Sequence, residues 1–337
     1  MPSESPPGFS RAKLHVVTGK GGTGKTTVAA SLALALASQG QDVLLCEVEG
    51  RQGIARLFDV EPLPYEERRI AVGLETDGHR PGTVYGLHID PESALLEYLA
   101  MYYKLGRAGR ALDRFGVIEF ATTLAPGVRD VLLTGKVYEA TKESRRGRGS
   151  RPYDAVVLDA PPTGRIAQFL GVNSELAGLA RMGPIKSQAD SVMKLFRSSR
   201  TAIHLVTVLE EMPVQETSDG IDQLREAGLP VGGVIVNMTR PRDLDESDLA
   251  GALEGTIDRA AVTADLKAAG LPAGRALVTG LLTEARDHAV RRTLEDEQRA
   301  IVSRLGVPTV ELPRMATGAD LGALYEFAAL LKDQGWA

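Results

Sequence analysis

A glycine-rich loop close to the start of the chain limits its possible folds more than any other segment. Residues 19–27 read GKGGTGKTT and satisfy the pattern G-x-x-x-x-G-K-[ST]. The apolar run LHVVT at 14–18 precedes the loop, and an Ala- and Leu-rich helical pattern follows it over 26–39. Glycines allow backbone N–H groups to close around phosphate oxygens, and the helix N-terminus adds a favourable dipole. We therefore expect a strand–loop–helix unit that binds the phosphates of ATP.

The residues of this phosphate loop have separate expected roles. Lys25 should reach the β- and γ-phosphates, Thr26 should supply a hydroxyl to Mg²⁺, and Thr27 is placed for the α-phosphate. Lys20, on the outer side of the loop, either contacts the phosphates of a facing subunit, as arginine fingers do elsewhere, or is an ordinary surface charge. The residues expected to bind the nucleotide through this loop are Gly21, Gly22, Thr23, Gly24, Lys25, Thr26 and Thr27.

Carboxylates at the ends of two further predicted strands are expected beside the loop. Asp159 closes the run AVVLD, which places it at the carboxyl edge of the sheet, where open α/β sheets bind ligands. We expect Asp159 to hold Mg²⁺ through water. Glu47 and Glu49 share one side of their strand. Glu49 is expected to orient the attacking water, with a structural role as the alternative, whereas Glu47 is expected to pair with a lysine. The expected catalytic residues are Lys20, Lys25, Glu49 and Asp159.

Three other polar residues lie in or at the end of apolar runs. Asn237 ends the run VGGVIVN, where its amide can donate to and accept from a purine edge. An Asx turn or a helix cap is the alternative role for this asparagine. His15 and His204 are expected to be core or strand-end residues rather than ligands. The sequence contains no recognisable arrangement of a serine or cysteine nucleophile and no histidine cluster with metal-ligand spacing.

Short apolar runs alternate with helix-length segments along the whole chain. The runs contain continuous Val, Leu and Ile, as parallel strands buried on both faces do. They cover residues 14–18, 42–48, 83–89, 154–160, 202–208, 230–237 and 308–312. The predicted fold class is α/β, with a doubly wound and mostly parallel sheet of the P-loop type. Helical insertions near 91–143 and 174–200 are expected to form a layer on one side of the sheet. We expect a disordered tail at 1–12 and a single domain over 13–337.

Composition argues against several classes of function. The formal net charge of −5 and the pI of about 5.7 lack the basic excess that is typical of nucleic-acid binders. Cys46 is the only cysteine, so neither an intramolecular disulfide nor a cysteine-built zinc site is expected, and a reducing cytoplasm fits. The start of the chain lacks the apolar region of a signal peptide, and no apolar stretch is long enough to cross a bilayer. We expect a cytoplasmic protein that meets a membrane only peripherally or through a partner.

Several segments resemble the arsenical-pump-driving ATPase family, which includes the eukaryotic ATPase that delivers tail-anchored membrane proteins. These segments are GKGGTGKTT at 19–27, TTLAPGVRDVLLTGKV at 122–137, LDAPPTGRIAQFL at 158–170 and VELPRMATGADLGALYEF at 310–327. Residues 44–65 are especially similar to actinobacterial members described as anion-transporter ATPases. Those members often occur as two related subunits, so the resemblance allows a homodimer or a heterodimer with a paralogous ATPase subunit.

The resemblance also implies roles for individual residues. It places Lys20 across a nucleotide-bound dimer, Asp159 in the second switch, and Asn237 with the loop at Pro313 around adenine. Residues 49–52 read EGRQ where the family has an aspartate that is usually followed by Pro-Ala-His. The Cys-x-x-Cys pair of the targeting branch and the metalloid-binding cysteines of the pump branch are both missing. We therefore expect neither a zinc site nor an arsenite or antimonite site.

Two classes of function are open, and a third is ranked behind them. The first is an ATP-hydrolysing dimeric switch that couples its nucleotide state to a protein or membrane-associated client. The alternative is an ATPase that energises the transport of a small anion. A partitioning-type positioning ATPase ranks third because a basic DNA-binding footprint is missing. The apolar helical patterns at 95–103 and 192–196 either pack on the sheet or line a client groove. The basic segment 143–151 is either a solvated connection or a contact for an acidic partner or lipid head groups.

Overall fold

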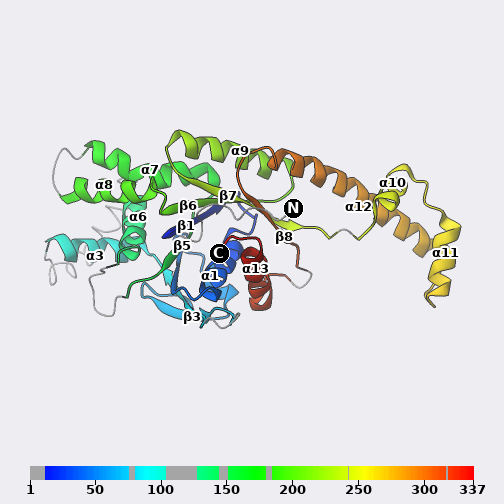
Figure 1. The fold of residues 1–337 in the computed structure, drawn as a ribbon, viewed down its shortest axis with the longest axis horizontal. Coiled ribbons are helices and arrows are strands. Elements are labelled where there is room, and N and C mark those ends of the chain that lie inside the picture. Colours follow the sequence, from blue (N-terminus) through cyan, green and yellow to red (C-terminus); the bar gives the residue numbers. More distant parts are fainter. Residues whose placement is uncertain are drawn as a thin grey trace.

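The centre of the molecule is a twisted sheet with helices on both faces (Figure 1). The computed structural model describes residues 12–75, 80–103, 127–143, 151–179, 184–241, 243–315 and 318–337. Within these residues the sheet has eight strands in the order β3-β4-β2-β5-β1-β6-β7-β8. Every neighbouring pair is parallel except β3 with β4, which is antiparallel. The predicted α/β class with a doubly wound, mostly parallel sheet is confirmed.

The strands lie where the apolar runs predicted them, with one addition. Their bounds are β1 Leu14–Gly19, β2 Val43–Glu47, β3 Arg68–Val72, β4 Thr83–His88, β5 Ala155–Asp159, β6 Thr201–Thr207, β7 Val231–Thr239 and β8 Thr309–Pro313. β1, β2, β5 and β6 are buried along their full lengths, as expected for strands covered on both faces. The sequence analysis missed β3, which lies at the edge of the sheet and begins with two exposed arginines.

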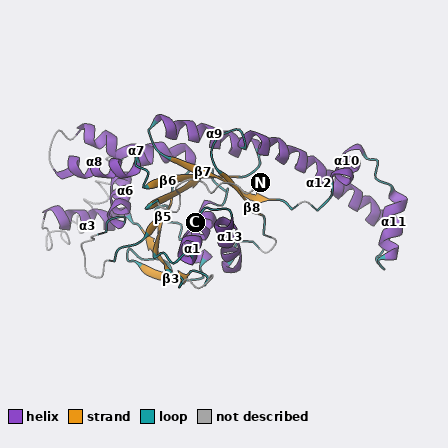
Figure 2. Cartoon of the chain, viewed as in Figure 1, coloured by secondary structure: helices purple, strands orange, loops and turns teal. Residues whose placement is uncertain are grey.

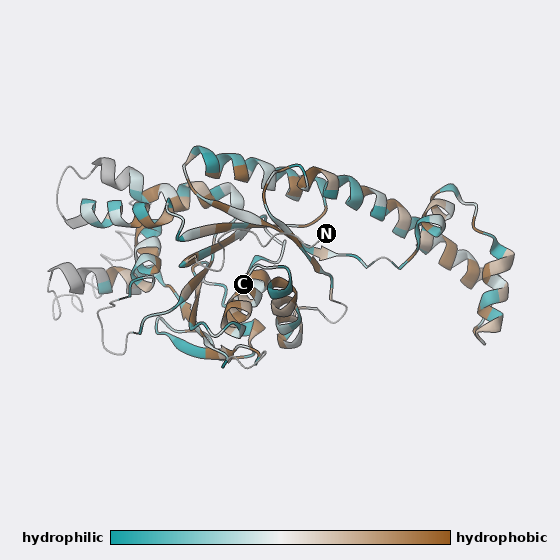
Figure 3. Cartoon of the chain, in the orientation of Figure 1, coloured by the Kyte–Doolittle hydropathy of each residue, from teal (hydrophilic) through white to brown (hydrophobic). Residues whose placement is uncertain are grey.

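Helices cover the sheet in two layers (Figure 2). Their bounds are α1 Lys25–Ser38, α2 Gly53–Leu57, α3 Pro91–Tyr103, α6 Val128–Ala140, α7 Thr163–Leu179, α8 Pro184–Phe196, α9 Glu211–Glu226, α10 Glu246–Glu254, α11 Arg259–Ala268, α12 Arg275–Val302 and α13 Leu321–Asp333. α1 and α13 share one apolar core with the sheet, and α6 to α9 share the other. Brown, hydrophobic strands between these layers in Figure 3 mark the interior of the molecule. This burial on both faces explains why the strand sequences show no alternation.

The helical insertions differ in detail from the prediction. The segment predicted at 91–143 forms α3 and α6, and residues 104–126 lie outside the described residues. The helix expected from 174 begins earlier, at Thr163, because α7 follows directly from the end of β5. α8 then covers most of the rest of the second predicted insertion. Residues 1–11 of the predicted tail lie outside the described residues, whereas Ala12 is buried in the core.

An arm of three helices leads away from the sheet. α12 is 28 residues long, and Figure 1 shows it extending from the body to α10 and α11 at its far end. α11 has no buried residue, and most of α12 is exposed. Among the helices of the described residues, none is long and apolar enough to cross a membrane.

Candidate functional site

The phosphate loop joins the end of β1 to the start of α1. Its backbone has positive φ angles of 90° at Gly22 and 87° at Gly24, a region that glycine enters without steric cost. A Cβ atom at Gly19 would lie 2.2 Å from the carbonyl oxygen of Val206, so a side chain has no room at that position. The N-cap residue of α1 is Gly24, which has no side chain to cap the first turn of the helix. The loop therefore presents the uncapped N–H groups of a helix N-terminus, the arrangement that binds phosphate oxygens.

Asn237 braces this loop from β7. Its buried Nδ2 donates a hydrogen bond of 2.9 Å to the carbonyl oxygen of Thr23. A Cβ atom at Gly24 would lie 2.3 Å from the same Nδ2, so the amide packs directly against the loop. Sequence analysis anticipated a polar role for Asn237 but missed this contact, which is neither an Asx turn nor a helix cap. Pro313, at the end of the neighbouring strand β8, pairs in register with Thr239 of β7. The contacts of Asn237 and Pro313 with adenine stay predictions.

Lys25, Thr26 and Asp159 come together at the carboxyl edge of the sheet. Thr26 Oγ1 donates a hydrogen bond of 2.7 Å to Asp159 Oδ2. Burial raises the pKa of Asp159 to about 7, although the hydrogen bond from Thr26 acts in the opposite direction. Burial lowers the pKa of Lys25, while the nearby carboxylates of Asp159 and Glu49 raise it. Lys25 Nζ also lies 3.4 Å from the carbonyl oxygen of Lys20, which folds this side chain back over the loop.

The two glutamates after β2 have different surroundings. Glu47 is buried, and its Oε1 accepts a hydrogen bond of 2.7 Å from the backbone N–H of Gly53. Its Oε2 lies 4.0 Å from Nδ1 of His88, and burial raises its pKa. The predicted lysine partner of Glu47 is therefore wrong, because the first turn of α2 and a histidine of β4 occupy that place. Glu49 is half-buried and lies close enough to Lys25 and Asp159 to affect the pKa of both.

Gln52 fixes the segment that carries Glu49. Its backbone has a φ of 53° and caps the start of α2. Its side-chain amide donates to the carbonyl oxygen of Leu63 at 3.1 Å and accepts from the N–H of Leu63 at 2.8 Å. The role of Gln52 in this clamp was not predicted from the sequence, where only Glu49 of residues 49–52 had an expected role. Because the partner lies eleven residues away in an irregular segment, no local pattern indicates the contact.

Lys20 is engaged within its own chain. Its Nζ lies 2.7 Å from Oε1 of Glu216 on α9, and about a third of each side chain is exposed, 31% and 37%. α9 follows β6, the neighbour of β1, so it lies beside the outer side of the loop. Lys20 is therefore not an unpaired surface charge in this conformation. Gly21 and Gly22, the next residues of the loop, are exposed, and a Cβ atom at either would meet no atom of the described residues within 4 Å.

The oxygen atoms at this site suit Mg²⁺. Magnesium binds hard oxygen ligands, keeps several waters, and commonly uses one or two protein groups together with substrate phosphates. The hydroxyl of Thr26 and the buried carboxylate of Asp159 provide such a pair beside the loop. Within the described residues there is no cluster of three or more His, Cys, Asp or Glu side chains that could hold a metal by itself. The donor set therefore fits a magnesium ion that a nucleotide brings, and it does not resemble an all-protein metal cage.

Comparisons with known proteins agree with this geometry. Residues 12–199 match the family described as anion-transporting ATPase. The chain is 53% identical over 331 residues to the ATPase BagA of Mycobacterium tuberculosis. The alignment covers 98% of this chain and 95% of that protein. It is 26% identical over 266 residues to the ATPase GET3 of Kluyveromyces lactis, with 69% of this chain and 73% of that protein covered. It is also 26% identical over 260 residues to an arsenical pump-driving ATPase of Acidiphilium multivorum, with 70% and 41% covered.

Proposed function

Because the chain belongs to the anion-transporting ATPase family and is an ATPase, we propose that it acts as a dimeric switch whose nucleotide state controls the binding of a protein or membrane-associated client. Its partner in the dimer is a second copy of the chain or a paralogous ATPase subunit. One observation carries the proposal. Both segments that leave the candidate site, after Asp159 and after Glu49, connect through polar contacts to the helices α3 and α6.

The connection after Asp159 runs through α7. This helix begins at Thr163, and Arg165 in its first turn has Nη2 at 3.5 Å from Oδ2 of Asp130. Asp130 lies in the first turn of α6. A displacement of the segment after Asp159 would therefore act on the start of α6.

The connection after Glu49 runs through Tyr65. Gln52 holds Leu63, and two residues later the hydroxyl of Tyr65 donates a hydrogen bond of 2.6 Å to Oε2 of Glu97 on α3. Glu97 in turn lies 2.8 Å from Nζ of Lys136 on α6. Both connections end on α6, so this helix is placed to respond to rearrangement at either side of the nucleotide.

In the proposed reaction, Lys25 neutralises charge on the β- and γ-phosphates, and Thr26 and Asp159 hold the metal site. A bound Mg²⁺ would supply positive charge that stabilises the transferring phosphoryl group. Glu49 orients the attacking water, with its carboxylate near Lys25 and Asp159. Lys20 leaves Glu216 and contributes a positive charge to the nucleotide of the facing subunit, and the open outer turn of the loop supports this assignment.

The alternative function is an ATPase that energises the transport of a small anion. The description of the family supports this alternative in name only. The connections from the site to α3 and α6 favour the client-coupled switch, because they give the nucleotide state a route into the helical layer.

Hydrogen exchange of α6 tests the proposed coupling. We expect the backbone amides of residues 128–140 to exchange at different rates with a non-hydrolysable ATP analogue and with ADP. The double variant Arg165→Ala/Glu97→Ala should still bind nucleotide but should lose this difference, because both connections to α6 are cut. Arg225→Ala is the matched control, since among the described residues the exposed Arg225 of α9 contacts Asp222 of the same helix and the carbonyl oxygen of Leu305, which lies after α12. Equal exchange of α6 in both nucleotide states of the wild type would contradict the switch.

A further inference from the structure

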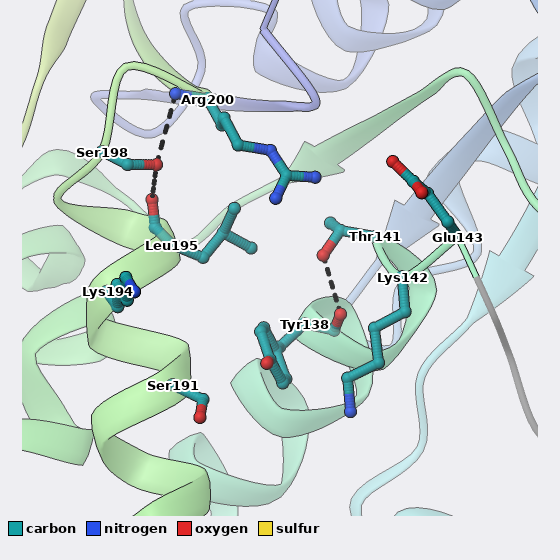
Figure 4. Close-up of a pocket in the computed structure, with 9 residues that line it drawn as sticks. All are labelled: Tyr138, Thr141, Lys142, Glu143, Ser191, Lys194, Leu195, Ser198 and Arg200. Carbon is teal, nitrogen blue, oxygen red and sulfur yellow. Dashed lines mark hydrogen bonds between the residues drawn. The ribbon is translucent and has the colours of Figure 1, made fainter.

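A cavity lies near the amino ends of the strands, whereas the phosphate loop lies at their carboxyl ends. Its volume is about 740 Å³, within the range of small-molecule pockets. It is lined by the end of α6, by α8, and by the turn that leads into β6 (Figure 4). Arg200 of this turn directly precedes β6, and Val206 near the other end of β6 contacts Gly19 of the loop. At about 3.3 Å per strand residue, the two sites are about 20 Å apart.

The lining of this cavity is cationic in an otherwise acidic chain. Lys142, Lys194 and Arg200 contribute three positive charges, and Glu143 contributes the single negative charge of the lining. Within the described part of the chain, none of the three cations forms an ion pair with a carboxylate. The net charge of the whole chain is −5, so this concentration of positive charge runs against the average of the molecule.

The backbone that carries these cations is held in place. Thr141 Oγ1 donates to the carbonyl oxygen of Tyr138 at 2.7 Å, which closes the turn at the end of α6. Ser198 Oγ donates to the carbonyl oxygen of Leu195 at 2.7 Å and accepts from the N–H of Arg200 at 3.2 Å, which closes the turn after α8. Two local networks therefore fix the turns on opposite sides of the cavity, and the cationic side chains extend from these fixed points.

The three cations line the cavity from α8, from the turn before β6 and from the end of α6. In Figure 4 the guanidinium of Arg200 extends from its turn toward the end of α6. Lys142 lies on the other side of the cavity, and its side chain runs away from Arg200 to place Nζ 4.5 Å from the centre of the Tyr138 ring. Within the described residues, the arginine fork and the two lysines have no carboxylate ion-pair partner, and their donors suit the several oxygens and the double charge of a phosphate group. A carboxylate ligand would use fewer of these donors.

We propose that this cavity, which we call the α6–α8 pocket and define by Lys142, Lys194 and Arg200, binds a phosphate-bearing anion that is distinct from the nucleotide in the phosphate loop. The chemistry is the same for a free phosphate compound and for the head group of an anionic lipid. The proposal does not depend on the dimeric switch, because the pocket is formed within one chain.

Two probes distinguish the possible sources of the anion. The full chain is saturated with Mg-ADP and titrated with inorganic pyrophosphate by calorimetry, and it is mixed in parallel with vesicles of phosphatidylglycerol or of phosphatidylcholine. We expect the double variant Lys194→Ala/Arg200→Ala to weaken binding of the pyrophosphate or of the anionic vesicles by about tenfold or more, since each lost contact is charge-assisted. Pyrophosphate binding identifies a free phosphate compound, and binding of anionic vesicles alone identifies a lipid head group.

Matched variants keep the test specific. Arg197→Ala/Lys267→Ala removes the same two residue types at exposed positions outside the pocket and should bind both probes like the wild type. An unchanged affinity for ADP shows that the pocket variant is folded. Binding of neither probe by the wild type overturns the proposal, and so does equal binding by the wild type and the pocket variant. ATP hydrolysis is measured on the same samples. A chain that hydrolyses ATP normally but fails the anion test contradicts the pocket proposal and leaves the proposed switch standing.

Discussion

At the scale of single residues, the ion pair between Lys20 and Glu216 sets the resting position of the loop's outer lysine. The two charged atoms are 2.7 Å apart, and both side chains are partly exposed. An exposed pair of this kind stabilises by at most about 1 kcal/mol. The pair is therefore strong enough to bias the position of Lys20 and weak enough to open in the proposed dimer, where a second subunit would offer a phosphate.

Neutralising Glu216 should make Lys20 more available. We expect Glu216→Gln to lower the protein concentration that gives half-maximal ATP hydrolysis by up to about fivefold, the equivalent of about 1 kcal/mol. Specific activity measured over a range of protein concentration checks this expectation. Glu226→Gln removes a carboxylate from an exposed position on the same helix and should have no effect. A higher concentration requirement for Glu216→Gln would mean that Glu216 assists the reaction rather than restraining Lys20.

The amide of Asn237 should be needed for the shape of the phosphate loop. Asn237→Ala removes the hydrogen bond to the carbonyl oxygen of Thr23 and leaves a buried acceptor without its partner. We expect a loss of about 1–3 kcal/mol in the free energy of unfolding and a weaker affinity for ATP. Thr239→Ala is the control. Thr239 lies two residues after Asn237 on β7, and its hydroxyl donates to the carbonyl oxygen of Leu312 on β8. Chemical denaturation and nucleotide titration provide the two readouts, and wild-type values in both would remove Asn237 from the loop's support.

Some residues of the site could be predicted from the sequence and others could not. Lys25 and Thr26 follow from one continuous motif, and Asp159 follows from its place at the end of an apolar run. Glu216 and Gln52 could not be found in this way. Their partners lie on other segments of the chain, so the contacts depend on how α9 and the segment before β3 pack.

At the scale of elements, β1 and β6 carry a buried pair of histidines. His15 Nδ1 lies 3.1 Å from His204 Nε2, and the ring of His204 lies 5.2 Å from that of Trp336. Gly232 and Gly233 of β7 leave room for the histidine and the tryptophan, because a Cβ atom at either would lie within 3 Å of those rings. The prediction that both histidines belong to the core is confirmed by their complete burial.

This histidine pair should make the fold sensitive to acid. Burial lowers the pKa of His15 to about 4 and lowers that of His204 well below its ordinary value of 6.5. The unfolded chain therefore binds more protons than the folded chain between these values, and the free energy of unfolding falls as the pH drops from 6.5 toward 4. The expected slope is up to about 1.4 kcal/mol per pH unit for each histidine.

Denaturation across this pH range measures the effect. His15→Gln/His204→Gln should flatten the dependence, because glutamine does not titrate. His288→Gln, on the partly exposed arm helix α12, should keep the wild-type slope. An unchanged slope in the double variant would assign the acid sensitivity to other groups.

Elements were predictable where burial controls their sequence. The continuous apolar runs became β1, β2 and β4 to β8, and the runs of β1, β2, β5 and β6 are buried on both faces along their full lengths. β3 has one edge in solvent and starts with arginines, so its sequence resembles a loop. α10 and α11 bury almost nothing, so no contact with the core constrains their sequences.

At the scale of the whole molecule, polar contacts connect the candidate nucleotide site to the helical layer, and the proposed dimer adds a facing subunit. The contacts through Arg165 and Tyr65 reach α6, and the exposed outer turn of the loop leaves Lys20 accessible from outside. The central claim is that each site receives its Lys20 from the other subunit. A chain with an altered Lys20 and a chain with an altered Lys25 would then lack different halves of one site.

Mixing two inactive variants tests this claim most directly. Lys20→Ala and Lys25→Ala should each hydrolyse ATP poorly when purified alone. Mixed in equal amounts, they should recover about a quarter of wild-type activity, because half of the dimers are mixed and each mixed dimer has one complete site. If the wild type is active but the mixture hydrolyses ATP no faster than its two components alone, Lys20 does not act across a dimer of this chain.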